Sequence, residues 1–144
     1  MSQSNQANQV ALNNTVEIRK MTTPKILVVD DESTIRDVVA TCLRRLGGWE
    51  TLTASSGQEA LHLATTEQPD VIVLDMMMPE MDGFVFLQHL RANPITHAIP
   101  VIFLTASLYY PDSFLLTQLG VVLVIAKPFR AVDLVHQVAH VMQW

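Results

Sequence analysis

Short apolar runs alternate with longer amphipathic segments along the chain from residue 25 onward. The apolar runs predict five β-strands, at 26–30, 50–54, 71–75, 101–105 and 121–126. Three of these runs consist almost entirely of Val, Ile, Leu or Phe, which is typical of strands buried on both faces of a sheet. Strands that alternate with helices indicate a parallel sheet covered on both sides, so the pattern favours one doubly wound α/β domain.

The segments between and after the strands predict five helices. The first should cover 34–46, capped by Ser33 and ended by a pair of glycines. Residues at helical spacing form an apolar stripe that we expect to face the core: Ile35, Val38, Val39, Cys42 and Leu46. A capping-box pattern from Ser56 to Glu59 predicts the start of the second helix, which should reach Glu67. The remaining helices are expected to start near Gly83, after Pro111 and near Arg130.

The first 22 residues differ in composition from the rest of the chain. They are rich in Gln and Asn and have few apolar side chains, so we expect a mobile tail at 1–22 and a single domain at 23–144. Val16 and Ile18 alternate with polar neighbours, which leaves open a short extra strand or helix docked on the domain.

Charge and cysteine content exclude several classes of protein. The 144 residues carry a formal net charge of −5, and no basic cluster is longer than Arg44-Arg45, which argues against nucleic acid or an anionic membrane as a direct partner. No apolar run approaches the roughly 20 residues that cross a bilayer. Cys42 is the only cysteine, so it forms no internal disulfide, and we expect it to pack in the core of a cytoplasmic protein.

Polar groups stand at the carboxyl ends of four of the five predicted strands: Asp30, Asp31 and Glu32 at the first, Asp75 at the third, Thr105 at the fourth and Lys127 just after the fifth. In a parallel sheet these strand ends meet at one edge, where ligands bind. Clustered carboxylates require a cation, and their oxygen atoms suit Mg²⁺. Lys127 and Thr105 add a positive charge and a hydroxyl donor, which completes a cradle for a phosphoryl group. An Asp can attack phosphorus, so Asp75 is our choice for the acceptor.

These residues lie in segments that resemble the receiver domains of two-component response regulators, including the stand-alone chemotaxis-type regulators. The resemblance covers about residues 24–142 and is carried by KILVVDDE at 25–32, VIVLDMMMPEMDG at 71–83, PVIFLTA at 100–106 and KPF at 127–129. It implies a flavodoxin-like, doubly wound, five-stranded parallel sheet in the order 2-1-3-4-5 with five helices.

The resemblance also implies a function and a division of roles. Asp75 would accept a phosphoryl group from a sensor histidine kinase or a histidine phosphotransfer protein. The ligands of Mg²⁺ would be Asp31, Asp75, Asp30 through water, and the backbone carbonyl of Met77. Thr105 and Lys127 would hold the phosphoryl oxygens, and a cis bond before Pro128 would place the lysine. The protein would not be an enzyme in its own right, but a phosphoacceptor that takes part in its own phosphorylation and dephosphorylation.

The sequence departs from the family at the step that transmits the signal. Family members commonly carry Tyr or Phe three residues before the lysine, where this chain has Val124, which is stiff at χ1. An apolar group beside the fifth strand could form a surface for an unknown target or for a homodimer through the fourth helix, fifth strand and fifth helix. It comprises Leu108, Tyr109, Tyr110, Phe114, Leu115 and Leu116.

The sequence is therefore compatible with three functions. The first is a phosphorylation-controlled signalling module whose output is a protein contact, because the chain ends just after the fifth helix. The second is a scaffold that keeps the fold without phosphorylation, which Val124 allows. The third, a phosphatase, is weaker because the Met77 side chain cannot act as a second acid. Met76 to Met78 are expected to serve packing, and His136 with His140 lacks a third metal ligand.

Overall fold

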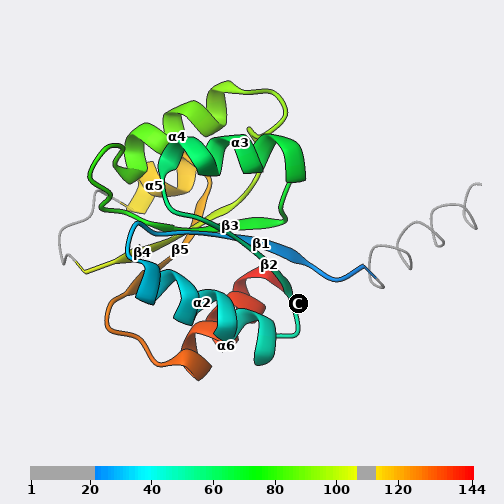
Figure 1. Ribbon diagram of the computed structural model, residues 1–144. Helices are drawn as coiled ribbons and strands as arrows, with labels where there is room; N and C mark the ends of the chain where they lie inside the picture. Colours follow the sequence, from blue (N-terminus) through cyan, green and yellow to red (C-terminus); the bar gives the residue numbers. More distant parts are fainter. Residues whose placement is uncertain (1–21, 107–112) are drawn as a thin grey trace, which may run out of the picture.

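The computed structural model describes residues 22–106 and 113–144. Its centre is a parallel sheet in the order β2-β1-β3-β4-β5 (Figure 1), which confirms the predicted fold class and strand order. The strands are β1 (Lys25–Val29), β2 (Glu50–Ala54), β3 (Val71–Asp75), β4 (Val101–Thr105) and β5 (Val121–Ala126). Every residue of β3 and β4 is buried, as expected for central strands covered on both faces.

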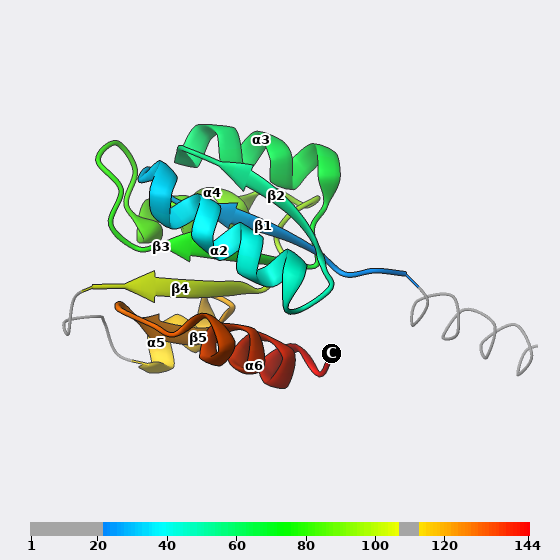
Figure 2. The ribbon, with the colours of Figure 1, turned by 60° about the horizontal axis from the view of Figure 1, so that its bottom comes forward.

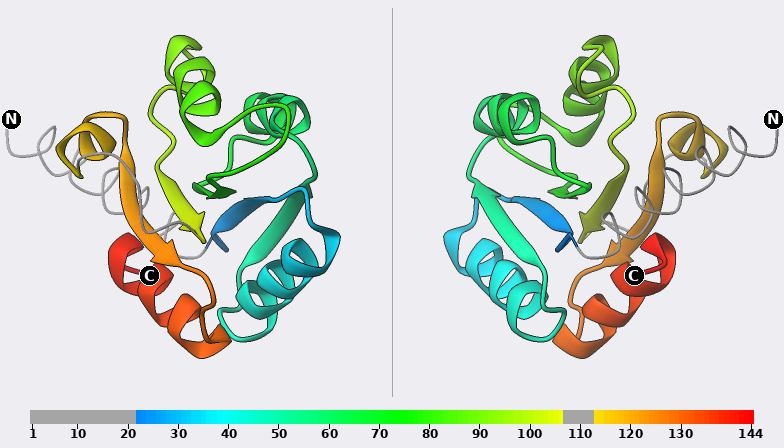
Figure 3. Two further views of the ribbon diagram at one scale, coloured as in Figure 1. Left: turned by 90° about the vertical axis from the view of Figure 1, so that its left-hand side faces the viewer. Right: turned by 90° about the vertical axis from the view of Figure 1, so that its right-hand side faces the viewer.

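Five helices in the described residues cover the two faces of the sheet. They are α2 (Ser33–Arg45), α3 (Gly57–Glu67), α4 (Gly83–Ala92), α5 (Ser113–Gln118) and α6 (Ala131–Met142). The view along the sheet shows α2 and α6 on one face and α3, α4 and α5 on the other (Figure 3). Two apolar cores result, one on each side of the sheet. None of the helices described here is long and apolar enough to cross a membrane.

Helix α2 differs from its prediction in its start and in its buried face. It begins at Ser33, and the residue before it, Glu32, makes no side-chain cap. The predicted stripe is wrong at Val38 and Leu46, which are 51% and 56% exposed. Ala40 and Leu43 are buried instead, because α2 lies in front of the sheet with α6 (Figure 2) and leaves its outer flank open. Cys42 is partly buried and packs against the core, as predicted.

The start of α3 follows the predicted capping box with one change of partner. The Ser56 hydroxyl accepts a hydrogen bond from the Glu59 amide, as predicted. The Glu59 carboxylate accepts from the amide and the hydroxyl of Ser55 rather than from the Ser56 amide. The reciprocal bonds still satisfy the first turn of the helix.

Two groups of predictions lie outside the described residues. The expected tail, with Val16 and Ile18, falls almost entirely within 1–21. Leu108, Tyr109 and Tyr110 fall within 107–112.

Candidate functional site

The predicted strand ends meet at one edge of the sheet. Asp30 directly follows β1, whereas Asp75 and Thr105 are the last residues of β3 and β4. Because β1, β3 and β4 are parallel neighbours, their carboxyl ends are adjacent. One carboxylate oxygen from each of Asp30, Asp31 and Asp75 lies within 4.8 Å of the other two. The three candidate metal-binding carboxylates therefore form a single cluster.

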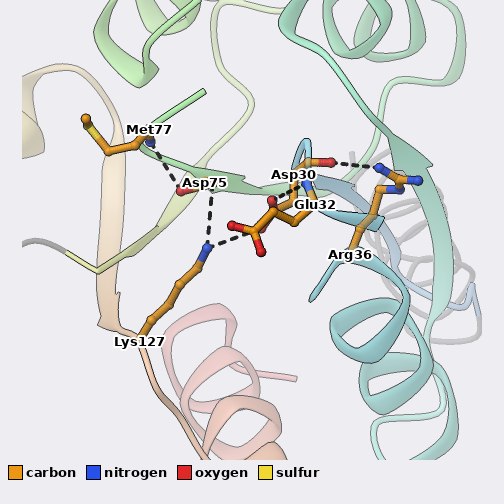
Figure 4. Close-up of polar contacts among 6 residues, drawn as sticks. All are labelled: Asp30, Glu32, Arg36, Asp75, Met77 and Lys127. Carbon is orange, nitrogen blue, oxygen red and sulfur yellow. Dashed lines mark hydrogen bonds and ion pairs between the residues drawn. The ribbon is translucent and has the colours of Figure 1, made fainter. Parts of the chain in front are cut away.

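Lys127 brings a positive charge into this cluster. Its Nζ lies 3.3 Å from Asp30 Oδ2 and 3.6 Å from Asp75 Oδ2 (Figure 4). The side chain is only 14% exposed, so solvent screens these ion pairs weakly. The backbone amide of Lys127 donates to the carbonyl of Thr105 at 2.8 Å, and the bond from Lys127 to Pro128 is cis, as expected. The lysine is thus tied to the end of β4.

Asp30 is fixed by contacts to both its backbone and its carboxylate. It is 1% exposed, and its Oδ1 accepts from the Glu32 amide at 2.9 Å. Its own amide donates to the carbonyl of Ala54, and its carbonyl accepts from Arg36 Nη1 at 2.9 Å. Together with the Lys127 contact, these bonds fix both the backbone and the carboxylate of Asp30.

Asp75 is a buried carboxylate with an unfavourable environment for its charge. Burial raises its pKa above the ordinary value of 3.8, and the neighbouring charges of Asp30 and Asp31 act in the same direction. The Met77 amide, which donates to Asp75 Oδ1 at 3.2 Å, and the Lys127 ammonium both lower the pKa without reversing the shift. A cation at this edge would stabilise the ionised form that a nucleophile needs.

The remaining predicted site residues take separate places. Thr105 is 1% exposed at the end of β4. Met76 and Met78 are buried and pack in the core, as predicted. The prediction that all three methionines serve packing is wrong at Met77, which is 66% exposed. His136 and His140 belong to no group of three or more potential metal ligands in 22–106 and 113–144.

The surface expected to carry the output is only partly described. Val124, at the position of the family's aromatic residue, is partly buried and packs against the core on the α4 and α5 side. Phe114 on α5 is 68% exposed and Val122 on β5 is 42% exposed, whereas Leu116 is buried. Leu116 is the buried residue of α5 and belongs to the apolar core on that side of the sheet.

Sequence reasoning missed one residue that touches the site. Arg36 lies in the first turns of α2 and bonds the backbone of Asp30, so no sequence motif marks it. The spacing of six residues between donor and acceptor is the only signal available, and it is not specific.

Comparison with known proteins agrees with the fold and identifies the family. The family model described as "Response regulator receiver domain" matches residues 26–139, and the chain belongs to this family. A solved chemotaxis protein, CheY4 of Vibrio cholerae, is 32% identical with a TM-score of 0.75, covering 83% of this chain and 99% of that one. A receiver domain from Methanoculleus marisnigri is 37% identical with a TM-score of 0.68, covering 83% of this chain and 96% of that one.

Curated relatives are longer than this chain. The "Probable transcriptional regulator ycf27" of Guillardia theta is 37% identical over 91% of this chain and 50% of the relative. PhoP of Bacillus subtilis, an "Alkaline phosphatase synthesis transcriptional regulatory protein", is 43% identical over 73% of this chain and 42% of the relative. The chain spans about half the length of the curated relatives that it matches.

Proposed function

We propose that this receiver domain accepts a phosphoryl group on Asp75 from a histidine kinase or a histidine phosphotransfer protein. The observation that carries the proposal is the position of the Asp75 carboxylate, 3.6 Å from Lys127 Nζ and within 4.8 Å of two further carboxylates. A buried acceptor between a cation and a potential metal site is suited to phosphoryl transfer.

The transfer is a displacement at phosphorus. A lone pair of an Asp75 oxygen forms the new O–P bond, while the P–N bond of the phosphohistidine breaks and its electrons return to the imidazole ring. Lys127 neutralises charge on the phosphoryl oxygens, and the Thr105 hydroxyl is the nearby donor for them. The chain thus acts as a phosphoacceptor that assists its own phosphorylation and dephosphorylation, and not as an enzyme with a separate substrate.

The donor set fits Mg²⁺, which prefers oxygen ligands and takes one or two carboxylates with water and phosphate oxygens. Asp31 and Asp75 would be direct ligands, together with the backbone carbonyl of Met77. Asp30 would act through water, because its two oxygens already accept from the Glu32 amide and Lys127. The ion would supply a Lewis acid that offsets the negative charge of the phosphoryl group and the carboxylates.

A groove beside the site supports contact with a donor protein. A cavity of about 410 Å³ lies next to Lys127 and is mostly apolar. Its lining residues are Thr34, Ile35, Val38, Ala106, Lys127, Pro128 and Phe129. A protein docked there would bring its phosphohistidine close to Asp75.

The output is proposed to be a protein contact. Phe114 and Val122 are exposed on the face formed by α5, β5 and α6, which suits an unknown target or a homodimer. The relatives named as transcriptional regulators favour a second candidate, in which the receiver controls a DNA-binding protein or domain. The acidic receiver itself is not expected to bind nucleic acid. We place the protein in the cytoplasm, where such donors act.

The test is the intact mass of the protein after incubation with acetyl phosphate and Mg²⁺. We expect a gain of one phosphoryl group that Asp75→Asn and EDTA abolish. Asp70→Asn is the matched control, because Asp70 is exposed before β3, far from the cluster, and should leave the gain unchanged. Absence of any gain, together with absence of Mg²⁺ binding, would favour a scaffold that works without phosphorylation. Steady release of phosphate would favour a phosphatase.

A further inference from the structure

Arg36 is a charged residue that contacts the site through a backbone carbonyl and not through a carboxylate. Its Nη1 donates to the backbone carbonyl of Asp30 at 2.9 Å, and within the described part of the chain its guanidinium makes no ion pair with a carboxylate. Arg36 is partly buried in the first turns of α2, next to the acidic loop of residues 30–32 that joins β1 to α2 (Figure 4). The positive charge of Arg36 opposes the binding of Mg²⁺ nearby, so any favourable contribution of Arg36 to the site must be structural.

The carbonyl that Arg36 holds belongs to the peptide bond between Asp30 and Asp31. Because a peptide unit is planar, a bond to its oxygen fixes the orientation of the whole unit and limits the backbone rotation at Asp31. The direction in which the Asp31 side chain leaves the backbone is set in the same way.

Asp31 depends on this restraint more than its neighbours do. Asp30 is fixed by Lys127 and the Glu32 amide, and Asp75 by Lys127 and the Met77 amide. Asp31 is exposed, and among residues 22–106 and 113–144 nothing forms a hydrogen bond or ion pair with its carboxylate. Its place within 4.8 Å of the other two carboxylates therefore comes from the backbone alone.

The loop also lacks the usual support from a helix cap. Glu32, the N-cap of α2, makes no side-chain cap hydrogen bond, and the first turn of α2 contains no acidic residue. Arg36 bonds this loop twice, since its amide donates to the carbonyl of Glu32 at 3.0 Å and its guanidinium donates to Asp30. The arginine thus connects the rigid helix to the peptide before Asp31.

We propose that Arg36 is a positioning residue of the magnesium site, which holds the peptide between Asp30 and Asp31 so that the Asp31 carboxylate faces the cluster. The inference rests on the proposed function, because it assumes that the cluster binds Mg²⁺. It requires that loss of Arg36 weakens Mg²⁺ binding even though the loss removes a repelling charge. If Arg36 acted only through its charge, its loss would make Mg²⁺ bind more tightly. A positioning role and a purely electrostatic role therefore predict opposite changes in Mg²⁺ affinity.

The test is calorimetric titration of Mg²⁺ into the wild type, Arg36→Met, Arg36→Lys and Arg45→Met. We expect Arg36→Met to bind Mg²⁺ about 10-fold more weakly, as is found when partners of metal ligands are removed. Arg36→Lys retains a donor of similar reach and should stay within about 3-fold of the wild type. Arg45→Met removes the same charge from the exposed far end of α2, about 13 Å along the helix, and should change little.

Thermal unfolding of the same variants in EDTA distinguishes a role of Arg36 in positioning Asp31 from a role in the stability of the fold. A purely structural arginine would lower the melting temperature and leave the Mg²⁺ affinity of the folded protein unchanged, which would overturn the inference. Equal or tighter binding by Arg36→Met would also overturn it. If the wild type binds no Mg²⁺, the proposed function itself fails. Should Arg36→Met not fold, Arg36→Gln provides the same neutral comparison.

Discussion

Replacing Asp75 by Asn is expected to stabilise the protein in the absence of Mg²⁺, although it removes an ion pair. Asn keeps the size of the side chain and an oxygen that accepts from the Met77 amide. What it loses is the charge, which is 3.6 Å from Lys127 but within 4.8 Å of the oxygens of Asp30 and Asp31.

The magnitude follows from these distances. With an effective dielectric constant of 20, attraction to Lys127 is about 4.6 kcal/mol and repulsion from buried Asp30 is at least about 3.5 kcal/mol. Exposed Asp31 is screened and adds about 1 kcal/mol of repulsion. The charge–charge energies nearly cancel, so the cost of burying the charge decides the sign. We expect a gain of about 1 to 2 kcal/mol, or about 3 to 8 °C in Tm.

The stability gained by Asp75→Asn should decrease as the pH falls. The pKa of Asp75 is raised in the folded protein, so its ionised form costs stability above the folded-state pKa. As the pH falls through that pKa, Asp75 takes up a proton, and the advantage of Asp75→Asn should shrink until it is lost below about 3.8. Saturating Mg²⁺ should stabilise the wild type more than the variant.

The assay is thermal unfolding in EDTA and in Mg²⁺, with Asp70→Asn as a matched control. The Asp70 carboxylate accepts from the Lys25 amide at 2.7 Å, and the amide oxygen of Asn can keep this bond, so we expect little change in stability. A variant that is less stable than the wild type in EDTA at neutral pH would refute the reasoning, because the ion pair with Lys127 would then outweigh burial and repulsion.

Three further substitutions test separate parts of the structure. Arg91→Met removes bonds of 2.7 Å to the carbonyls of Leu119 and Ile99, so we expect urea unfolding to show a loss of about 2 to 4 kcal/mol. Met77→Ala should leave Mg²⁺ affinity within about 2-fold in calorimetry, because only its backbone carbonyl is proposed to bind. Ser56→Ala should cost about 1 kcal/mol in urea unfolding through loss of the α3 cap.

Each of these predictions has a result that contradicts it. An unchanged unfolding midpoint for Arg91→Met would mean that water replaces the guanidinium at no cost. A large loss of Mg²⁺ affinity in Met77→Ala would assign a role to the exposed side chain. Equal stability of Ser56→Ala and the wild type would show that the hydroxyl bond is not needed for the helix start.

The strand ends could be predicted from the sequence because the apolar runs stop at the residues that carry the chemistry. Asp75 and Thr105 are each the last residue of a buried strand, and the parallel arrangement brings them together. The predicted first strand lies one residue too far along the chain, because β1 runs from Lys25 to Val29 and Asp30 takes no part in the strand pairing. This shift does not move Asp30 away from the edge.

Contacts to the backbone could not be predicted in the same way. Arg36 and Arg91 both donate to main-chain carbonyls, which every residue possesses, so neither partner leaves a mark in the sequence. The prediction of the buried face of α2 is wrong at Val38 and Leu46 for a related reason. Apolar spacing shows that a helix has an apolar side, but the way α2 packs on the sheet and against α6 decides whether Val38 or Leu43 is buried.

The most direct test of the central claim is to locate the phosphoryl group. The protein is phosphorylated with acetyl phosphate and Mg²⁺, reduced with borohydride, which converts an aspartyl phosphate to homoserine, and digested for peptide mass spectrometry. We predict homoserine at position 75 and unmodified aspartate at positions 30 and 31. Homoserine at position 30 or 31 instead, or at no position under conditions in which Mg²⁺ is bound, would contradict the account.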